Sequence, residues 1–222
     1  MRKPKNTSNF LDLTKVTGLS PNYYGPKPLA NIHEFYLCDE IHEASEYIDW
    51  FNTIRHADEN DVIKIYINSP GGNLYTAIQF MRVMSETNAH IIASVEGACM
   101  SAATMIFLCA DSFEVTPHSV FMFHNYSGGT VGKGGEMISQ LVHEKKWTER
   151  IFNSVYSGFL SEAEIKSIIE DKDIWMDGDE VVERMNKMVA EQEKKAKKEL
   201  KEISLKTKPD KKSQPKASPD QS

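Results

Sequence analysis

Ser101 is the residue of this chain whose setting best suits nucleophilic chemistry. An apolar run at residues 90–95 predicts a short buried strand, Gly97 predicts a turn, and the uniformly apolar segment 102–110 predicts a buried helix. Ser101 would then lie in the first turn of that helix, where free N–H groups and the helix dipole stabilise negative charge. An acyl-transfer serine needs this setting, although small residues around a serine also serve ordinary helix packing.

The turn Asn68-Ser69-Pro70-Gly71-Gly72 follows a β-branched run at 62–67 and precedes a helical stripe of apolar residues at 74–84. Its backbone amides could converge on an anion. The Lys-Ser/Thr of a P-loop and the spacing G-x-G-x-x-G are both missing, which disfavours a nucleotide phosphate. An oxyanion hole and a plain strand-to-helix turn remain as interpretations.

His124 ends a predicted strand at 120–123, and open α/β sheets gather their ligands at the carboxyl ends of strands. A general base could therefore stand there, although a lone histidine is often structural. Asp173 follows a helix and precedes an apolar triplet, and Asp171 is its nearest competitor for a role in the site.

Metal and cofactor chemistry find little support, because neither H-E-x-x-H nor C-x-x-C occurs. His33, Cys38 and His42 bracket a predicted strand and the turn after it, which is a poor arrangement for ligands. We therefore expect no metal and no cofactor.

The three cysteines have no paired spacing and apolar neighbours, so we predict buried thiols in a reducing compartment, with the cytoplasm as the default. Trp147 and Trp175 occupy apolar positions and are interpreted as core residues.

The order of elements predicts an α/β fold of βαβ units with a mostly parallel sheet. A glycine-rich loop at 127–135 leads into a long helix at 136–156, and Ser161 with Glu164 forms a capping box. We expect a flexible arm at 1–30, one folded domain at 31–189, and a charged helix end with a disordered basic tail at 190–222.

The charge of the chain is unevenly distributed. Residues 190–222 carry ten lysines and six acidic residues, a net charge of +4. Because the whole chain has a net charge of −6, residues 1–189 have a net charge of −10. An acidic body disfavours nucleic acid as the main ligand. No apolar run approaches the roughly 20 residues of a membrane span, so we expect no membrane partner.

Taken together, these motifs resemble the ClpP family, the proteolytic subunits of Clp proteases. The turn 66–72 is similar to that family's strand-to-helix motif, and Gly97 and Ser101 match its serine signature, with Cys99 and Met100 in place of two alanines. The segment 119–124 resembles the segment that ends in the family's catalytic histidine, and 173–176 falls where its aspartate lies.

The resemblance covers residues 33–185 and implies a serine endopeptidase with the triad Ser101, His124 and Asp173. It assigns the oxyanion hole to the backbone N–H groups of Gly72 and Ala102. It also implies a crotonase-like fold with a protruding handle, homo-oligomeric rings, unfolded polypeptide substrates and an AAA+ unfoldase as partner.

Several features depart from the family pattern. Asn125-Tyr126 stands where Gln-Pro is usual, the arm does not match the family's axial loops, and the basic tail is extra. Such divergence suits a specialised relative, for example a phage-encoded protease of capsid maturation.

Other functions also remain open. One is a Ser-Lys peptidase that uses Lys133, Lys145 or Lys146, a second is an acyl-CoA enzyme of the crotonase superfamily, and a third is a ring or scaffold subunit with a degenerate site.

Overall fold

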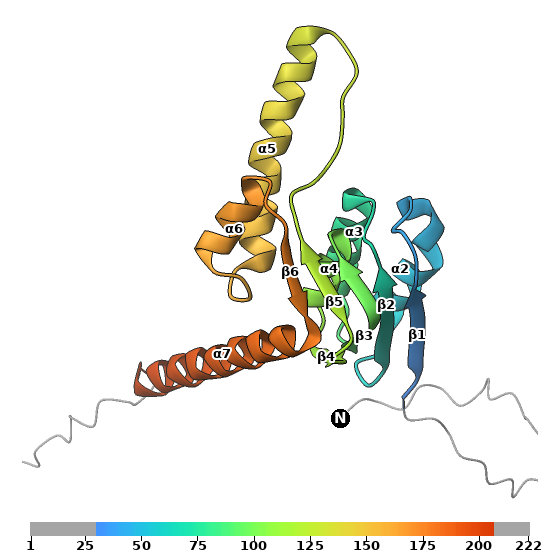
Figure 1. Cartoon of the computed structure of the whole chain (residues 1–222). Coiled ribbons are helices and arrows are strands. Elements are labelled where there is room, and N and C mark those ends of the chain that lie inside the picture. The colour runs from blue at the N-terminus through green and yellow to red at the C-terminus, as the bar shows by residue number, and fades with distance from the viewer. Residues whose placement is uncertain (1–29, 207–222) are drawn as a thin grey trace, which may run out of the picture.

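The computed structural model describes residues 30–206, which form a sheet with covering helices, a projecting helix and a long C-terminal helix (Figure 1). The strands are β1 (Ile32–Leu37), β2 (Val62–Ser69), β3 (His90–Met100), β4 (Ser112–Val115), β5 (Val120–Phe123) and β6 (Ile174–Asp177). The helices are η2, a 3-10 helix (Ala44–Tyr47), α2 (Ile48–His56), α3 (Leu74–Met84), α4 (Ala102–Leu108), α5 (Gly134–Tyr156), α6 (Glu162–Ile169) and α7 (Gly178–Lys206). The predicted α/β class is confirmed. Residues 1–29 and 207–222 lie outside the described part, and the three-part division of the chain stays a prediction.

The sheet has the order β1-β2-β3-β5-β6, and β4 pairs with β3 off this path. All pairs are parallel except β5 with β6. The first half of β3 pairs with β4, and its last three residues pair with β5. Parallel pairing brings the carboxyl ends of β2, β3 and β5 to one edge, which is where the candidate residues lie.

The expected turn at Gly97 is wrong, because β3 continues through this glycine to Met100. An added Cβ at Gly97 would lie 2.6 Å from the side-chain oxygen of Asn68, so that oxygen occupies the space beside the strand. The same oxygen accepts a hydrogen bond from the Ala98 N–H at 2.9 Å. Gly97 therefore lets the end of β2 pack closely against an unbroken β3.

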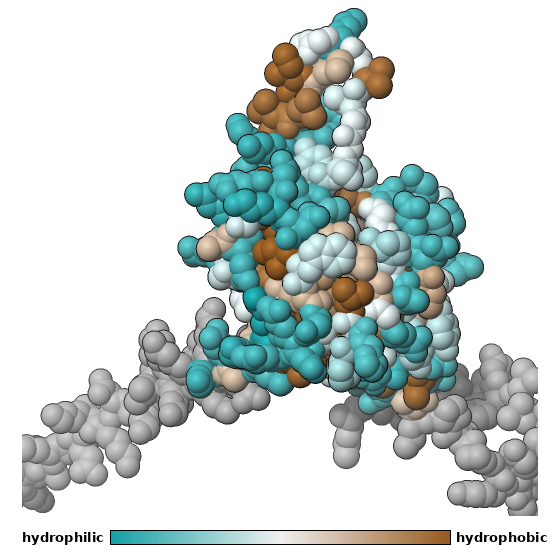
Figure 2. Space-filling view, in the orientation of Figure 1, coloured by the Kyte–Doolittle hydropathy of each residue, from teal (hydrophilic) through white to brown (hydrophobic). Residues whose placement is uncertain are grey.

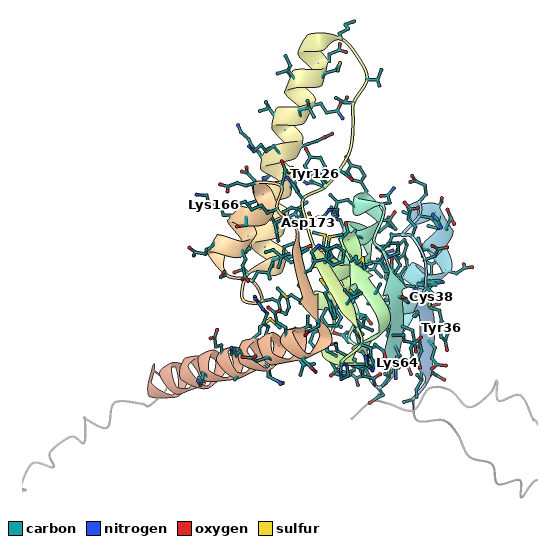
Figure 3. The ribbon with its side chains drawn as sticks, viewed as in Figure 1. Tyr36, Cys38, Lys64, Tyr126, Lys166 and Asp173 are labelled. Carbon is teal, nitrogen blue, oxygen red and sulfur yellow. The ribbon has the colours of Figure 1, made fainter. Side chains whose placement is uncertain are left out.

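The run 62–67 is rich in β-branched residues, which predicts a buried strand, but only one face of β2 is buried. Ile63, Ile65 and Ile67 are buried in the core, whereas Lys64 and Tyr66 belong to the opposite, partly exposed face. Polar contacts occupy that face, and Figure 3 locates Lys64 and Tyr36 on the β1–β2 side of the sheet. The side chains of β2 thus alternate between a buried and a partly exposed face of the sheet, although the composition of the strand favoured burial of both faces.

The predicted capping box is confirmed at the start of α6. The Ser161 N–H donates to the Glu164 carboxylate at 2.8 Å, and the Glu164 N–H donates to the Ser161 hydroxyl oxygen at 3.3 Å. Two guanidinium nitrogens of Arg184 on α7 also bind this carboxylate, and chiefly for this reason the pKa of Glu164 falls to about 2. The cap therefore also fastens α6 to α7.

A handle, formed by the loop 127–133 and α5, projects from the body (Figure 1). Exposed apolar side chains gather near its end, as the brown atoms of Figure 2 show. They include Val131, Ile138, Leu141 and Val142. An apolar patch at the end of a projection is typical of a contact surface.

Asp61 fastens the beginning of β1 to the turn before β2. Its carboxylate accepts hydrogen bonds from the Asn31 N–H at 2.7 Å and the Asp58 N–H at 3.0 Å, and the His33 ring lies 3.2 Å away. These bonds, the backbone ones foremost, lower the pKa of Asp61 from 3.8 to about 2. Because the folded-state pKa is the lower one, this stabilisation is present above pH 4 and is lost as the pH falls toward 2.

We therefore expect Asp61→Asn to lower the free energy of unfolding at neutral pH and to weaken its dependence on pH between about 4 and 2. Urea unfolding at a series of pH values measures both quantities. Glu59→Gln, an exposed acidic residue of the same turn, is the matched control. Equal acid dependence in the two variants would contradict this role of Asp61.

Candidate active site

The turn at 68–72 is held by internal hydrogen bonds beside the end of β3. The buried Ser69 hydroxyl donates to the Asp39 carbonyl at 2.6 Å and accepts from the Gly71 N–H at 3.1 Å. Gly71 and Gly72 have φ of 96° and 142°, conformations that favour glycine. The side chain of Asn73 then caps α3. The turn is therefore a rigid platform at the carboxyl edge of the sheet.

Ser101 lies on a sharp corner between β3 and α4. It is the N-cap residue rather than part of the first helical turn, with φ 52° and ψ −128°. Such a conformation costs a non-glycine residue about 1–3 kcal/mol and persists only where its surroundings enforce it. Here the Ser101 N–H donates to the Met122 carbonyl at 2.8 Å, and a Cβ at Gly71 would lie 2.6 Å from the Ser101 Cβ. The corner thus holds the hydroxyl clear of both elements, as strained serine turns do in α/β hydrolases.

His124 lies against this hydroxyl. Its Nε2 is 2.6 Å from Ser101 Oγ. The pairing of the strands explains this contact. Met100 pairs with Met122 in the parallel β3–β5 ladder, so the residues after both strands lie at the same edge of the sheet. The imidazole is half-buried, and a serine with an imidazole nitrogen at this distance can pass its proton to the ring.

Two backbone N–H groups border the serine. Ile41 pairs with Gly72 in a parallel bridge in which Gly71 and Asn73 make the hydrogen bonds, so the Gly72 N–H points away from Ile41. A Cβ at Gly72 would lie 2.7 Å from the Ile41 nitrogen, which excludes other residues there. Ala102 opens α4 and has no intrahelical partner for its N–H. Both residues border the same cleft as Ser101.

A model of the Clp protease family matches residues 29–210 of the chain. The chain belongs to the Clp protease family. The α/β architecture with a mostly parallel sheet agrees with this membership.

Curated relatives of this Clp protease family member carry the name ATP-dependent Clp protease proteolytic subunit. The Porphyromonas gingivalis protein is 26% identical over 153 residues, which are 67% of this chain and 65% of that protein. The Pleurastrum terricola protein is 32% identical over 123 residues, 54% of this chain and 61% of that protein. The Chlorella vulgaris protein is 28% identical over 109 residues, 47% of this chain and 54% of that protein. The chain thus matches between about half and two thirds of the length of these relatives.

Asp173 lies opposite His124, but no hydrogen bond joins the two side chains. In the antiparallel β5–β6 ladder Phe123 pairs with Ile174, so Asp173 falls opposite His124 in register. Figure 3 locates Asp173 just before β6. Its carboxylate is exposed and makes no hydrogen bond to any described residue of this Clp protease family member. The structure therefore brings Ser101 and His124 together and leaves Asp173 as their neighbour.

Asp171, the competing carboxylate, is engaged elsewhere. It has φ 65° and accepts a hydrogen bond from the Asn125 amide at 2.7 Å. The same amide approaches the Ile169 carbonyl at 3.4 Å, so Asn125 ties the residue after His124 to the turn before β6. Sequence reasoning noted Asn125 only as a departure from the family pattern.

A cleft of about 430 Å³ runs from Ser101 toward the handle. One side is formed by the beginning of α3, the other by the loop at 126–129, and the handle helix closes the end. Below the serine, Thr104 donates to the Ser101 carbonyl at 2.6 Å and contacts the Tyr156 hydroxyl at 2.9 Å. Tyr156 is buried, which raises its pKa well above the usual value. This contact anchors α5 beneath Ser101.

Both tryptophan assignments need correction. Trp147 is half-buried, lines the cleft and stacks on Tyr75, with 5.5 Å between ring centroids. Trp175 is 56% exposed, because alternation along the edge strand β6 turns it outward while Met176 is buried. Apolar sequence neighbours alone did not reveal either position.

The assignment of buried thiols is wrong for Cys38, which is exposed because it follows β1 on the outward side of the alternation. Cys99 is buried, and burial raises the pKa of the half-buried Cys109 to about 11. All three are free thiols.

The lysines of the Ser-Lys alternative, Lys133, Lys145 and Lys146, are exposed and do not line the cleft. Among the side chains that the structure describes, no group of three or more His, Cys, Asp or Glu residues could hold a metal ion. No helix within residues 30–206 is both long and apolar enough to cross a membrane.

Proposed function

We propose that this chain is a serine endopeptidase that cleaves unfolded polypeptides. Ser101 is the nucleophile, His124 the general base and acid, and Asp173 the carboxylate that orients the imidazole. The observation that carries the proposal is the 2.6 Å contact between Ser101 Oγ and His124 Nε2 on a strained corner of the backbone. A structural serine does not need that conformation, whereas a nucleophile gains exposure from it.

In the first half of the reaction, Ser101 Oγ attacks the carbonyl carbon of the scissile peptide bond while Nε2 of His124 takes the hydroxyl proton. The negative charge that forms on the carbonyl oxygen is stabilised by the N–H groups of Gly72 and Ala102. The C–N bond then breaks, and His124 returns the proton to the leaving amine. The product is an acyl-enzyme ester on Ser101.

The second half repeats these steps with water. His124 takes a proton from the water as its oxygen attacks the ester, and the same two N–H groups stabilise the second oxyanion. Collapse of this intermediate breaks the C–Oγ bond, and the proton passes to Ser101. Asp173 is proposed to hold the Nδ1–H of the ring and to balance its charge while it is protonated.

A ring assembly and an AAA+ unfoldase partner belong to the same proposal. The apolar side chains near the end of the handle support contacts between copies, and the relatives are named as ATP-dependent proteolytic subunits. Three free thiols suit a reducing compartment such as the cytoplasm. A ring or scaffold subunit with an idle site is a second candidate, favoured by the exposed carboxylate of Asp173, which makes no hydrogen bond to a described residue.

Labelling with a fluorophosphonate probe tests the proposal, because the probe reacts with activated serines. We expect an adduct on Ser101 in the unaltered protein and none in Ser101→Ala. Peptide mapping of the adduct identifies the residue. An unlabelled protein that is folded and assembled would favour the idle scaffold.

A further inference from the structure

The cleft beside Ser101 has an unusual charge distribution. Among the described residues that line it, Glu144 of α5 is the one carboxylate, and neither Lys nor Arg occurs. Glu144 is half-buried, and its Oε1 accepts a hydrogen bond from the Gln140 amide at 2.7 Å. The other carboxylate oxygen, Oε2, makes no hydrogen bond with a described residue and can receive a ligand.

The charge of Glu144 reaches the opposite wall of the cleft. Tyr126, on the loop after β5, lies at the foot of the handle in Figure 3 and also lines the cleft. The pKa of Tyr126 is raised, first by partial burial and then by the negative charge of Glu144, with Asp171 and Tyr75 adding to it. The carboxylate therefore acts on the interior of the cleft.

The remaining walls suit a long aliphatic stem. Tyr75 and Trp147 stack with 26° between their planes and present an aromatic surface. Met105 and Phe152 add apolar lining near the serine. Arg and Lys carry three or four methylenes before their charge, and their cations also associate with aromatic rings.

We propose that this cleft selects an arginine or lysine as the residue whose carbonyl Ser101 attacks, with Glu144 receiving the cationic end. The assignment rests on the proposed peptidase function. The side chain next to the attacked carbonyl is the one nearest the cleft, because Ser101, Ala102 and Gly72 all border it. The half-buried carboxylate of Glu144 would repel an Asp or Glu side chain, and a Leu side chain would offer that carboxylate no hydrogen-bond donor.

The test compares the rates at which two peptidyl diphenyl phosphonates label Ser101, one with Arg and one with Leu at the residue before the phosphorus. In the unaltered protein we expect the Arg probe to react about tenfold faster, as a hydrogen bond to a charged partner allows. Glu144→Gln keeps the shape but removes the charge, so the Arg:Leu rate ratio falls to about one. Glu149→Gln, on the same helix outside the cleft, leaves the ratio unchanged.

A charge reversal strengthens the test. Glu144→Lys is expected to favour a probe with Glu at that position over the Arg probe. A faster Leu probe whose advantage persists in Glu144→Gln would overturn the assignment of the cleft, while labelling of Ser101 would leave the peptidase function standing. Failure of both phosphonates and of the fluorophosphonate in folded protein would overturn both. Thermal unfolding of each variant establishes that it is folded.

Discussion

We expect Ser101→Ala to lower kcat/KM for peptide hydrolysis by at least about 10⁴-fold, equivalent to about 5.4 kcal/mol of transition-state stabilisation. The alanine removes the only protein atom that bonds to the substrate carbonyl carbon in the proposed mechanism. Activity that remains would come from binding and from the N–H groups of Gly72 and Ala102. Initial rates with a fluorogenic peptide measure the loss.

Two further variants make this expectation specific. Ser154→Ala changes an exposed serine on α5 outside the cleft and is expected to retain the full rate. A double variant, Ser101→Ala with His124→Ala, is expected to lose no more than Ser101→Ala alone, because the two side chains act as a unit. Additive losses would contradict a shared proton transfer between them.

The α/β order of elements could be predicted because its signals are local. Apolar periodicity placed α3 at 74–84 without error, and β5 at 120–123 likewise. Ser161 and Glu164 predicted a cap that depends on residues three apart. The length of β3 could not be read in this way, because Gly97 lies in the strand only when Asn68 from another strand fills the space beside it. Tertiary contact overrode the turn preference of glycine.

Only part of the candidate site could be predicted from the sequence. Motif order brought attention to Ser101 and His124, and parallel pairing explains why both reach the same edge. The backbone of Ser101 was misjudged, since a helix start gives no hint of φ 52°. Glu144 was missed because two lysines follow it and its helix is largely exposed. Only the approach of α5 to the beginning of α3 gives it a place in the cleft.

The third residue of the proposed triad can be decided by two matched variants. We expect Asp173→Asn to lower kcat/KM by about 10³–10⁴-fold, because a neutral amide replaces the charged acceptor and its NH2 group, by donating to Nδ1, favours the wrong tautomer of the imidazole. Register places Asp173 opposite His124, and residues opposite each other across an antiparallel pair have their side chains close together. Asp171→Asn keeps a residue that tolerates a positive φ and an oxygen that can still accept from Asn125, so we expect less than about a fivefold loss.

The same pair of variants also separates catalysis from folding. Both substitutions are exposed and isosteric, so thermal unfolding should change little in either. A large loss in Asp171→Asn alone would transfer the orienting role to Asp171 and imply that its bond to Asn125 is exchanged for one to His124. Small losses in both would mean that Ser101 and His124 work as a dyad. The predicted contrast has two requirements: Asp173 turns toward the imidazole during catalysis, and Asn125 holds Asp171 in the turn before β6. Only then do substitutions of two carboxylates two residues apart lower kcat/KM by amounts that differ by orders of magnitude.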